Sequence, residues 1–203
     1  MHRRLAACLL LSLVVPAGSA PRLKDGPGVS YFPTNVGDRW VIEMRYPTGT
    51  EEYTEEVTDV ENKDGALIIS IGREVDGKLP PQRSQIQITD KGIYRMSLQG
   101  SAYDAPYRIL KLPLKPGEAW TSEASSGGAQ STTFKYRAMR EEDVEVPAGK
   151  FRAFRIEVDI DTRGRSSRSA IWYGPGVGIV KMEHDDPAGG YVRVLKSFRP
   201  GRK

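Results

Sequence analysis

The sequence predicts a mainly β protein: a strongly curved antiparallel sheet or open barrel of about twelve strands, with one long irregular crossing segment. Three observations support this fold class. Apolar residues recur at every second position through most of the chain, Asp-Gly pairs separate several of these runs, and no stretch keeps helical apolar spacing for three turns. Because no helices alternate with the strands, we expect neighbouring strands to pair antiparallel.

The alternation defines the individual strands and the turns between them. At residues 40–46, aromatic and aliphatic side chains point to one face and charged side chains to the other. Asp64-Gly65 and Asp76-Gly77 end such runs and predict hairpins, because a tight turn needs positive φ. The expected strands cover residues 40–46, 52–60, 66–75, 85–89, 93–98, 119–123, 131–140, 143–146, 154–160, 168–173, 179–183 and 191–198.

Residues 100–117 interrupt this pattern. They are rich in apolar side chains without alternation, and Pro106, Pro113 and Pro116 exclude a central strand, because proline cannot donate to the ladder. We expect a long crossing segment here. It either covers the open mouth of the barrel as a lid or fills the interior permanently.

The first twenty residues have the layout of a secretory signal peptide. Arg3 and Arg4 precede an apolar run over residues 5–15, and small residues follow at 16–20. Cleavage after Ser19 or Ala20 is expected, and the mature chain is then exported to the periplasm or outside the cell. The predicted organisation is a signal peptide at 1–19, a linker at 20–29, a single antiparallel β domain at 30–200 and a tail at 201–203.

Cysteine content and charge narrow the setting further. Cys8 is the only cysteine, so a mature chain without the leader forms no disulfide and depends on burial and strand pairing. No segment after the leader approaches 18 continuous apolar residues, so no membrane span is expected in the mature chain. The formal net charge of +4 falls to +2 once the leader is removed, which is too weak to predict nucleic-acid binding.

Residues with catalytic potential are few. His184 is the single histidine outside the leader, and it lies in Glu183-His184-Asp185-Asp186, where strand neighbours point to opposite faces rather than to one metal. No Gly-x-Ser-x-Gly is present, and the glycine-rich residues 174–178 lead into a strand rather than a helix. We therefore predict a protein that is not an enzyme and has no cofactor and no metal site.

Two groups of residues are candidates for binding. The alternating apolar residues of the strands would line a pocket on the concave face. Side chains alone can fill a barrel of eight strands, whereas about twelve strands enclose more space. A short basic loop could contact an anionic headgroup or an acidic protein surface. The pocket candidates are Trp40, Ile42, Met44, Tyr46, Phe134, Tyr136, Phe154, Ile156 and Val158, and the loop candidates are Arg163, Arg165 and Arg168.

Four segments, in this order along the chain, resemble a family of secreted bacterial domains of uncharacterised function. They are residues 31–40 (YFPTNVGDRW), 112–120 (LPLKPGEAW), 146–151 (VPAGKF) and 172–181 (WYGPGVGIVK). Such domains are similar in architecture to the periplasmic lipoprotein carriers (LolA/LolB-like), which form an open antiparallel barrel with an apolar interior. The resemblance implies this fold and no catalytic residues.

Three functions follow as expectations. The first is a non-enzymatic exported domain that binds an apolar small molecule or lipid in its concave face. The second is a structural or protein-interaction domain of the cell envelope with a filled core, and its partner would be an envelope protein. The third is a hydrolase, which the single histidine disfavours.

Overall fold

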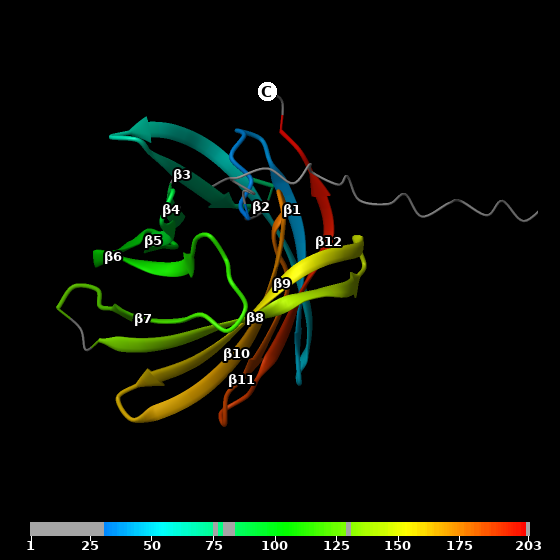
Figure 1. Cartoon of the computed structure of the whole chain (residues 1–203). Helices are drawn as coiled ribbons and strands as arrows, with labels where there is room; N and C mark the ends of the chain where they lie inside the picture. The colour runs from blue at the N-terminus through cyan, green and yellow to red at the C-terminus, as the bar shows by residue number, and fades with distance from the viewer. Residues whose placement is uncertain (1–30, 75–76, 79–83, 129–130, 202–203) are drawn as a thin grey trace, which may run out of the picture.

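The computed structural model describes residues 31–74, 77–78, 84–128 and 131–201, and in them a single twelve-stranded antiparallel sheet (Figure 1). No described helix is long and apolar enough to cross a membrane. The strands are β1 (Arg39–Tyr46), β2 (Gly49–Lys63), β3 (Ala66–Arg73), β4 (Ser84–Thr89), β5 (Gly92–Leu98), β6 (Ser101–Lys111), β7 (Ala119–Ala124), β8 (Thr132–Val146), β9 (Gly149–Thr162), β10 (Arg165–Gly174), β11 (Gly178–Asp185) and β12 (Tyr191–Arg199).

The sheet is a meander that curls until it is nearly closed. Its order is β6-β5-β4-β3-β2-β1-β12-β11-β10-β9-β8-β7, so the first and last strands pair in the middle of the sheet. β6 and β7 end up beside each other without a backbone ladder between them, and they form the one unsealed seam of the barrel (Figure 1). The predicted fold class is confirmed.

Two details of the predicted strands are wrong, and they compensate in the strand count. Residues 101–111 form β6 rather than an irregular crossing or lid, and only residues 112–118 between β6 and β7 are irregular. The strand tolerates Pro106 because β6 is an edge strand, and Pro106 has no partner in the β5 register. The two strands expected at 131–140 and 143–146 are one strand, β8, with an irregularity between Ala138 and Glu141.

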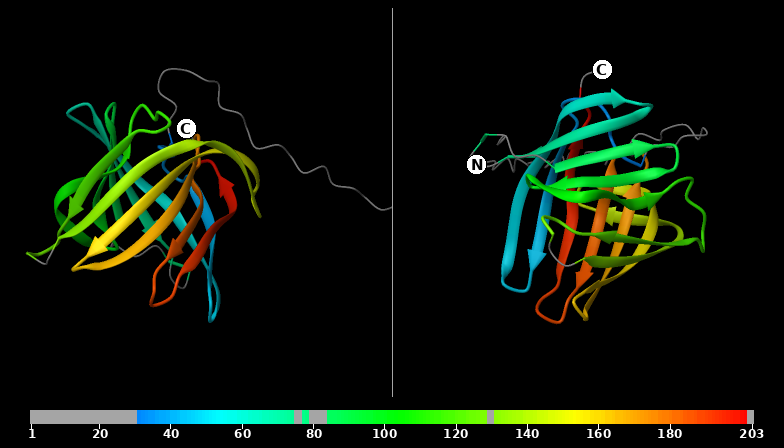
Figure 2. Two further views of the ribbon diagram at one scale, coloured as in Figure 1. Left: turned by 60° about the horizontal axis from the view of Figure 1, so that its bottom comes forward. Right: turned by 90° about the vertical axis from the view of Figure 1, so that its left-hand side faces the viewer.

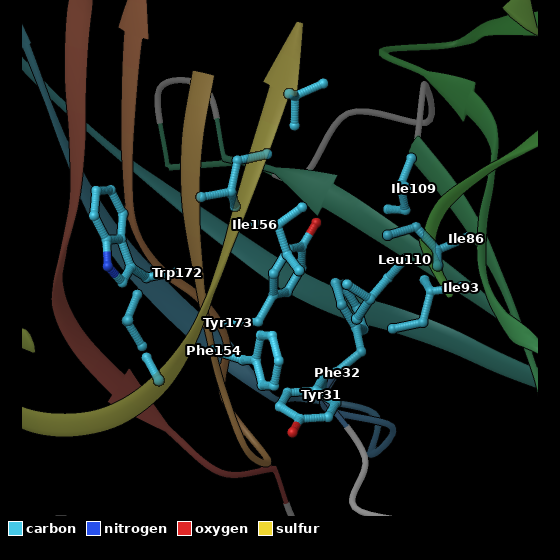
Figure 3. Packing of buried hydrophobic residues seen from close by; sticks show 14 of the residues in the cluster. Tyr31, Phe32, Ile86, Ile93, Ile109, Leu110, Phe154, Ile156, Trp172 and Tyr173 are labelled. Atoms are coloured by element: carbon cyan, nitrogen blue, oxygen red, sulfur yellow. The ribbon is translucent and has the colours of Figure 1, made fainter. Parts of the chain in front are cut away.

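The inward face of the barrel is filled mainly by apolar side chains from every strand. Figure 3 shows Ile86, Ile93 and Leu110 converging from one wall toward Phe154 and Tyr173 on the opposite wall. Tyr31 and Phe32, which precede β1, are also buried in this core. The period-two pattern therefore has the expected cause, because alternate residues of each strand are removed from water.

The β8–β9 hairpin bends back over the outer face of the sheet, as the arc at the right of Figure 1 shows. The backbone N–H of Ala148 donates to the carbonyl of Leu195 in β12 at 3.1 Å. Beneath the hairpin, the indole Nε1 of Trp172 donates to Glu142 Oε1 at 2.6 Å. Trp172 is therefore buried although it points away from the barrel interior, on the opposite side of β10 from Tyr173 (Figure 3).

The β1–β12 junction is fastened by one buried carboxylate. Asp38 is 1% exposed, and its Oδ2 and Oδ1 accept the backbone N–H groups of Asn35 at 2.7 Å and Gly201 at 2.8 Å. A side chain at Gly201 would collide with the carbonyl of Val36, only 2.1 Å from a Cβ at that position. The segment before β1 and the segment after β12 are thereby held together at one point.

The β6–β7 seam, which faces the viewer in Figure 2 (right), is bridged instead by scattered hydrogen bonds. The N–H of Asp104 donates to the carbonyl of Ser125 at 2.8 Å, and the hydroxyl of Ser122 donates to the carbonyl of Arg108 at 2.8 Å. Behind them a row of aromatic rings in successive contact, called here the aromatic row, spans the seam with centroid separations of 4.9–6.1 Å. The row consists of Trp120 on β7, Tyr136 and Phe134 on β8, and Tyr107 and Tyr103 on β6.

Candidate functional site

The predicted pocket residues mostly belong to the packed interior. Ile42, Phe154, Ile156 and Val158 are buried in the core, and Phe134 and Tyr136 belong to the aromatic row. Tyr46, at the end of β1, is 37% exposed, and its ring centroid lies 6.0 Å from that of Tyr191. Trp40 and Met44 are the two of the nine that line a cavity in the interior.

That interior cavity measures about 210 Å³ and is partly enclosed by β1–β5, β11 and β12. Its lining is amphipathic rather than purely apolar. One part consists of side chains such as Trp40, Met44 and Ile86, and another part is charged. The charged side chains around the cavity are Glu55, Arg73, Arg95 and Arg193.

The arginines reach the interior because each lies on the inward face of its strand. Glu55 on β2 is the register partner of both Trp40 on β1 and Arg73 on β3. Arg95 on β5 is paired with Ile86, and Arg193 on β12 is paired with Met44. Since register partners share a face, these charges point inward with the core residues.

Three of these groups form a connected cluster around Tyr53. The Arg73 guanidinium carbon lies 3.6 Å above the centre of the Tyr53 ring, which is a cation–π contact. Arg193 donates to the Tyr53 hydroxyl at 3.5 Å and to the carbonyl of Ile179 at 3.1 Å, and its Nη2 lies 3.6 Å from Glu55 Oε2. Arg193 is therefore held by fixed partners.

Arg95 faces the buried tyrosines on the other side of the interior. Burial raises the pKa of Tyr173 to about 12, and the positive charges of Arg95 and Arg193 both oppose that rise. Burial also raises the pKa of Tyr107, again against the influence of Arg95. The guanidinium of Arg95 therefore acts on the same interior region as that of Arg193.

Sequence reasoning missed these four charged residues because it assigned charge to the outer face. A signal was present: each arginine continues a period-two series of core residues. Arg73 follows Ile69 and Ile71, and Arg95 lies between Ile93 and Ser97. A charged residue in phase with buried neighbours predicts an inward charge.

A second, larger hollow of about 1100 Å³ lies on the outward face, across β7 to β12 and the end of β1. Its side chains come mainly from positions that alternate with the core, and many are charged. They largely neutralise one another, as in the contact of Arg168 with Asp159 at 3.1 Å and that of Arg155 with Glu157 at 2.9 Å. This groove is therefore a salt-bridged sheet surface without a dominant charge.

The predicted basic loop is the turn between β9 and β10. Arg165 forms an ion pair with Asp186 at 2.7 Å, and Arg168 pairs with Asp159. Arg163 is exposed at the turn with a φ of 57°. Two of the three predicted contact residues thus already have acidic neighbours.

His184 lies on the inward face near the open end of β11. Its Nδ1 is 2.9 Å from the hydroxyl of Ser169, its register partner on β10, and its ring centroid is 4.9 Å from that of Tyr191. The neighbouring Glu183 contacts Lys181 at 2.6 Å, and Asp186 contacts Arg165. Among the residues that the structure describes, no group of three or more histidine, cysteine, aspartate or glutamate side chains is placed to hold a metal ion.

Residues 121–192 match the DUF3108-like family. The matched segment runs from within β7 to the beginning of β12 and includes the hairpin that folds over Trp172. The expected resemblance to exported domains of uncharacterised function is confirmed. No curated protein matches the chain.

Two solved structures share the fold, each with a TM-score of 0.56. One is a "putative lipoprotein from Parabacteroides distasonis ATCC 8503", 13% identical, and the other is a "putative exported protein with YmcC-like fold" from Bacteroides fragilis NCTC 9343, 15% identical. Each alignment covers 83% of this chain and 98% of the other chain. Both structural alignments thus extend beyond the segment that the family model matches.

Proposed function

We propose that this chain is an exported, non-enzymatic β-barrel that binds a small amphipathic molecule in its interior cavity. The observation that carries the proposal is the composition of that cavity. Apolar side chains such as Trp40 and Met44 and fixed polar groups such as Arg193 surround the same space. A mixture of apolar walls and a few placed polar groups is typical of small-molecule sites.

The size of the cavity limits the ligand. A volume of about 210 Å³ corresponds to about seven water molecules at their liquid volume. It lies below the range of roughly 300–1000 Å³ that is usual for drug-sized ligands. The proposal therefore narrows the expected apolar ligand or lipid to a molecule of that small size, or to the end of a longer one.

Export is supported from two directions. The first twenty residues have the three-part layout of a signal peptide, although they lie outside the described residues. Of the two proteins that share the fold, one is described as a lipoprotein and the other as an exported protein. We place the mature chain in the cell envelope or outside the cell on these grounds.

The hydrolase alternative has one specific observation in its favour, the contact between Ser169 and His184. Ser169 and His184 are register partners in neighbouring strands, so their contact is what strand pairing alone produces. A hydrolytic pair also needs a third group that orients the histidine. The Tyr191 ring, which packs on His184, offers no such hydrogen bond. The nearby Asp186 carboxylate accepts hydrogen bonds from the backbone N–H of Ala188 and from Arg165 instead.

The proposal can be tested with three six-carbon probes: 1-hexanol, hexanoate and hexylammonium. Titration followed by ¹H–¹⁵N NMR is expected to show saturable shifts of the Trp40 indole N–H for at least one probe, because Trp40 lines the cavity. If none of the three produces a saturable shift, the binding proposal fails and a structural domain with a filled core is the better account.

A pair of tryptophan substitutions on β1 distinguishes a real cavity from packed core. Met44→Trp is expected to abolish the probe shifts with little loss of stability, because the larger ring enters existing space. Ile42→Trp is the control, since Ile42 is fully buried two residues away and does not line the cavity. Overpacking at Ile42 should lower the free energy of unfolding by about 1–3 kcal/mol. Equal losses at both positions would contradict the proposal.

A further inference from the structure

The charges around the interior cavity do not balance. Three arginines, Arg73, Arg95 and Arg193, face one acid, Glu55. Glu55 lies beside Arg193, with 3.6 Å between Nη2 and Oε2. Among the described residues, neither Arg73 nor Arg95 forms an ion pair.

Two guanidinium groups without an ion pair leave a net positive charge in this half-buried site, which the contact of Arg73 with the Tyr53 ring offsets only in part. Each positive charge is partly removed from water, and the two repel each other across a space of low dielectric. Arg39, which is also half-buried, is by contrast paired with both Glu56 and Glu74. Within the described part of the chain, exposed arginines such as Arg137 also lack an ion pair, but Arg73 and Arg95 are half-buried and line one cavity, so their two charges are concentrated there.

The shape of guanidinium indicates which anion fits. Its planar fork of N–H donors matches a carboxylate with two parallel hydrogen bonds, which a lysine ammonium cannot form. The stacking of Arg73 on the Tyr53 ring fixes the plane of that fork. The nearby Trp40, Met44 and Ile86 offer an apolar surface for the rest of the ligand.

We propose that the ligand of the interior cavity is a small carboxylate with an apolar body, whose carboxylate lies against Arg73 and Arg95. This inference rests on the proposed function, because it names the chemical class that the same cavity takes. In it, Arg193 and Glu55 act as a neutral pair that supports Tyr53. Arg73 and Arg95 are the groups that touch the ligand.

The experiment compares the affinities of the six-carbon probes for wild type, Arg73→Met and Arg95→Met. Methionine keeps much of the length and the apolar contact of the arginine and removes the guanidinium with its charge and its N–H donors. Hexanoate should bind wild type at least tenfold more tightly than 1-hexanol, and hexylammonium should bind most weakly. Each substitution should weaken hexanoate about tenfold and leave 1-hexanol unchanged. Arg137→Met is the matched control, because Arg137 is an exposed arginine on the outward face of β8, and it should change nothing.

The possible outcomes separate the two proposals. If 1-hexanol and hexanoate bind equally and both variants keep the wild-type affinities, the cavity binds a ligand but the carboxylate inference is overturned. If no probe binds wild type, the proposed function itself fails. A fourth probe, hexyl phosphate, tests the anion: tenfold tighter binding than hexanoate overturns the carboxylate in favour of a phosphate ester. The thermal midpoints of Arg73→Met and Arg95→Met are measured as a control for folding. If they equal that of wild type, a loss of binding in these variants is not caused by a loss of folding.

Discussion

The barrel closes at two junctions that are built differently. At the β1–β12 junction a continuous backbone ladder joins the strands, and the buried Asp38 fastens the segments that flank them. At the β6–β7 seam the backbone contributes an isolated bond from Asp104 to Ser125, and side-chain hydrogen bonds and the aromatic row supply the rest. One junction depends on the backbone and the other on side chains.

The difference indicates where the barrel can open. A ladder yields cooperatively, because each of its bonds is supported by its neighbours, whereas separate side-chain bonds can break locally at small cost. The strand edges at the seam are also the places where unpaired N–H and C=O groups remain. We therefore expect the seam to open first and the β1–β12 junction to open only on global unfolding.

The largest effect should come from removing the carboxylate at the backbone junction. Asp38→Ala leaves two partly buried backbone N–H groups, those of Asn35 and Gly201, without their acceptors. The free energy of unfolding should fall by about 2–4 kcal/mol, measured by urea denaturation. Asp104→Ala is the matched change at the seam. The exposed Asp104 carboxylate accepts hydrogen bonds from the Ser125 hydroxyl and the Gly127 N–H, and its loss should lower the free energy of unfolding clearly less. Equal losses would remove the distinction between the junctions.

Much of the fold was predictable from the sequence because its signal is local. Period-two alternation reports which residues leave water, and Asp-Gly turns report where strands reverse. The exception was β6, where alternation is masked by bulges against β5 and by Pro106. Edge strands carry fewer pairing constraints, so their sequences depart furthest from the pattern.

The cavity was less predictable because it depends on register between distant strands. Trp40 and Met44 were found from apolar character alone, but their arginine neighbours come from β3, β5 and β12. Whether Arg193 faces Met44 is decided by the irregularity after Val41, which shifts the β1–β12 register. Such a bulge arises from packing in three dimensions and leaves no motif in the sequence.

Alkaline pH should weaken the fold through its buried tyrosines. Burial raises the pKa of Tyr173 to about 12, above the value near 10 of an exposed tyrosine, so the unfolded chain loses its proton first. The contribution of Tyr173 to the free energy of unfolding is therefore complete below pH 10 and is lost as the pH rises through 12. At pH 12 the loss from this residue alone is roughly 2 kcal/mol. Unfolding by urea at pH 9.5 and 11.5 measures the decline.

The same experiment sharpens the comparison of the junctions. Burial also raises the pKa values of Tyr107 and Tyr136, which belong to the aromatic row behind the seam. Tyr136→Phe removes one of these titrating groups and should make the decline with pH shallower than in wild type. An equally steep decline in this variant would show that Tyr136 does not contribute to it.

The smallest effect should be the most local one. Ser122→Ala removes the hydroxyl that donates to the carbonyl of Arg108 across the seam, at a cost of about 1 kcal/mol. If the seam opens independently, this loss lowers only the free energy of local opening. Amide hydrogen exchange of β6 and β7 should then accelerate about fivefold. Peptides from β1 and β12, followed by mass spectrometry, should show no change in exchange.

Ser197→Ala, a change at an exposed serine on β12, is the matched control and should leave the exchange of every strand as in wild type. Faster exchange in all strands of Ser122→Ala would mean that the seam and the backbone junction open together, and the two-junction description would then be wrong.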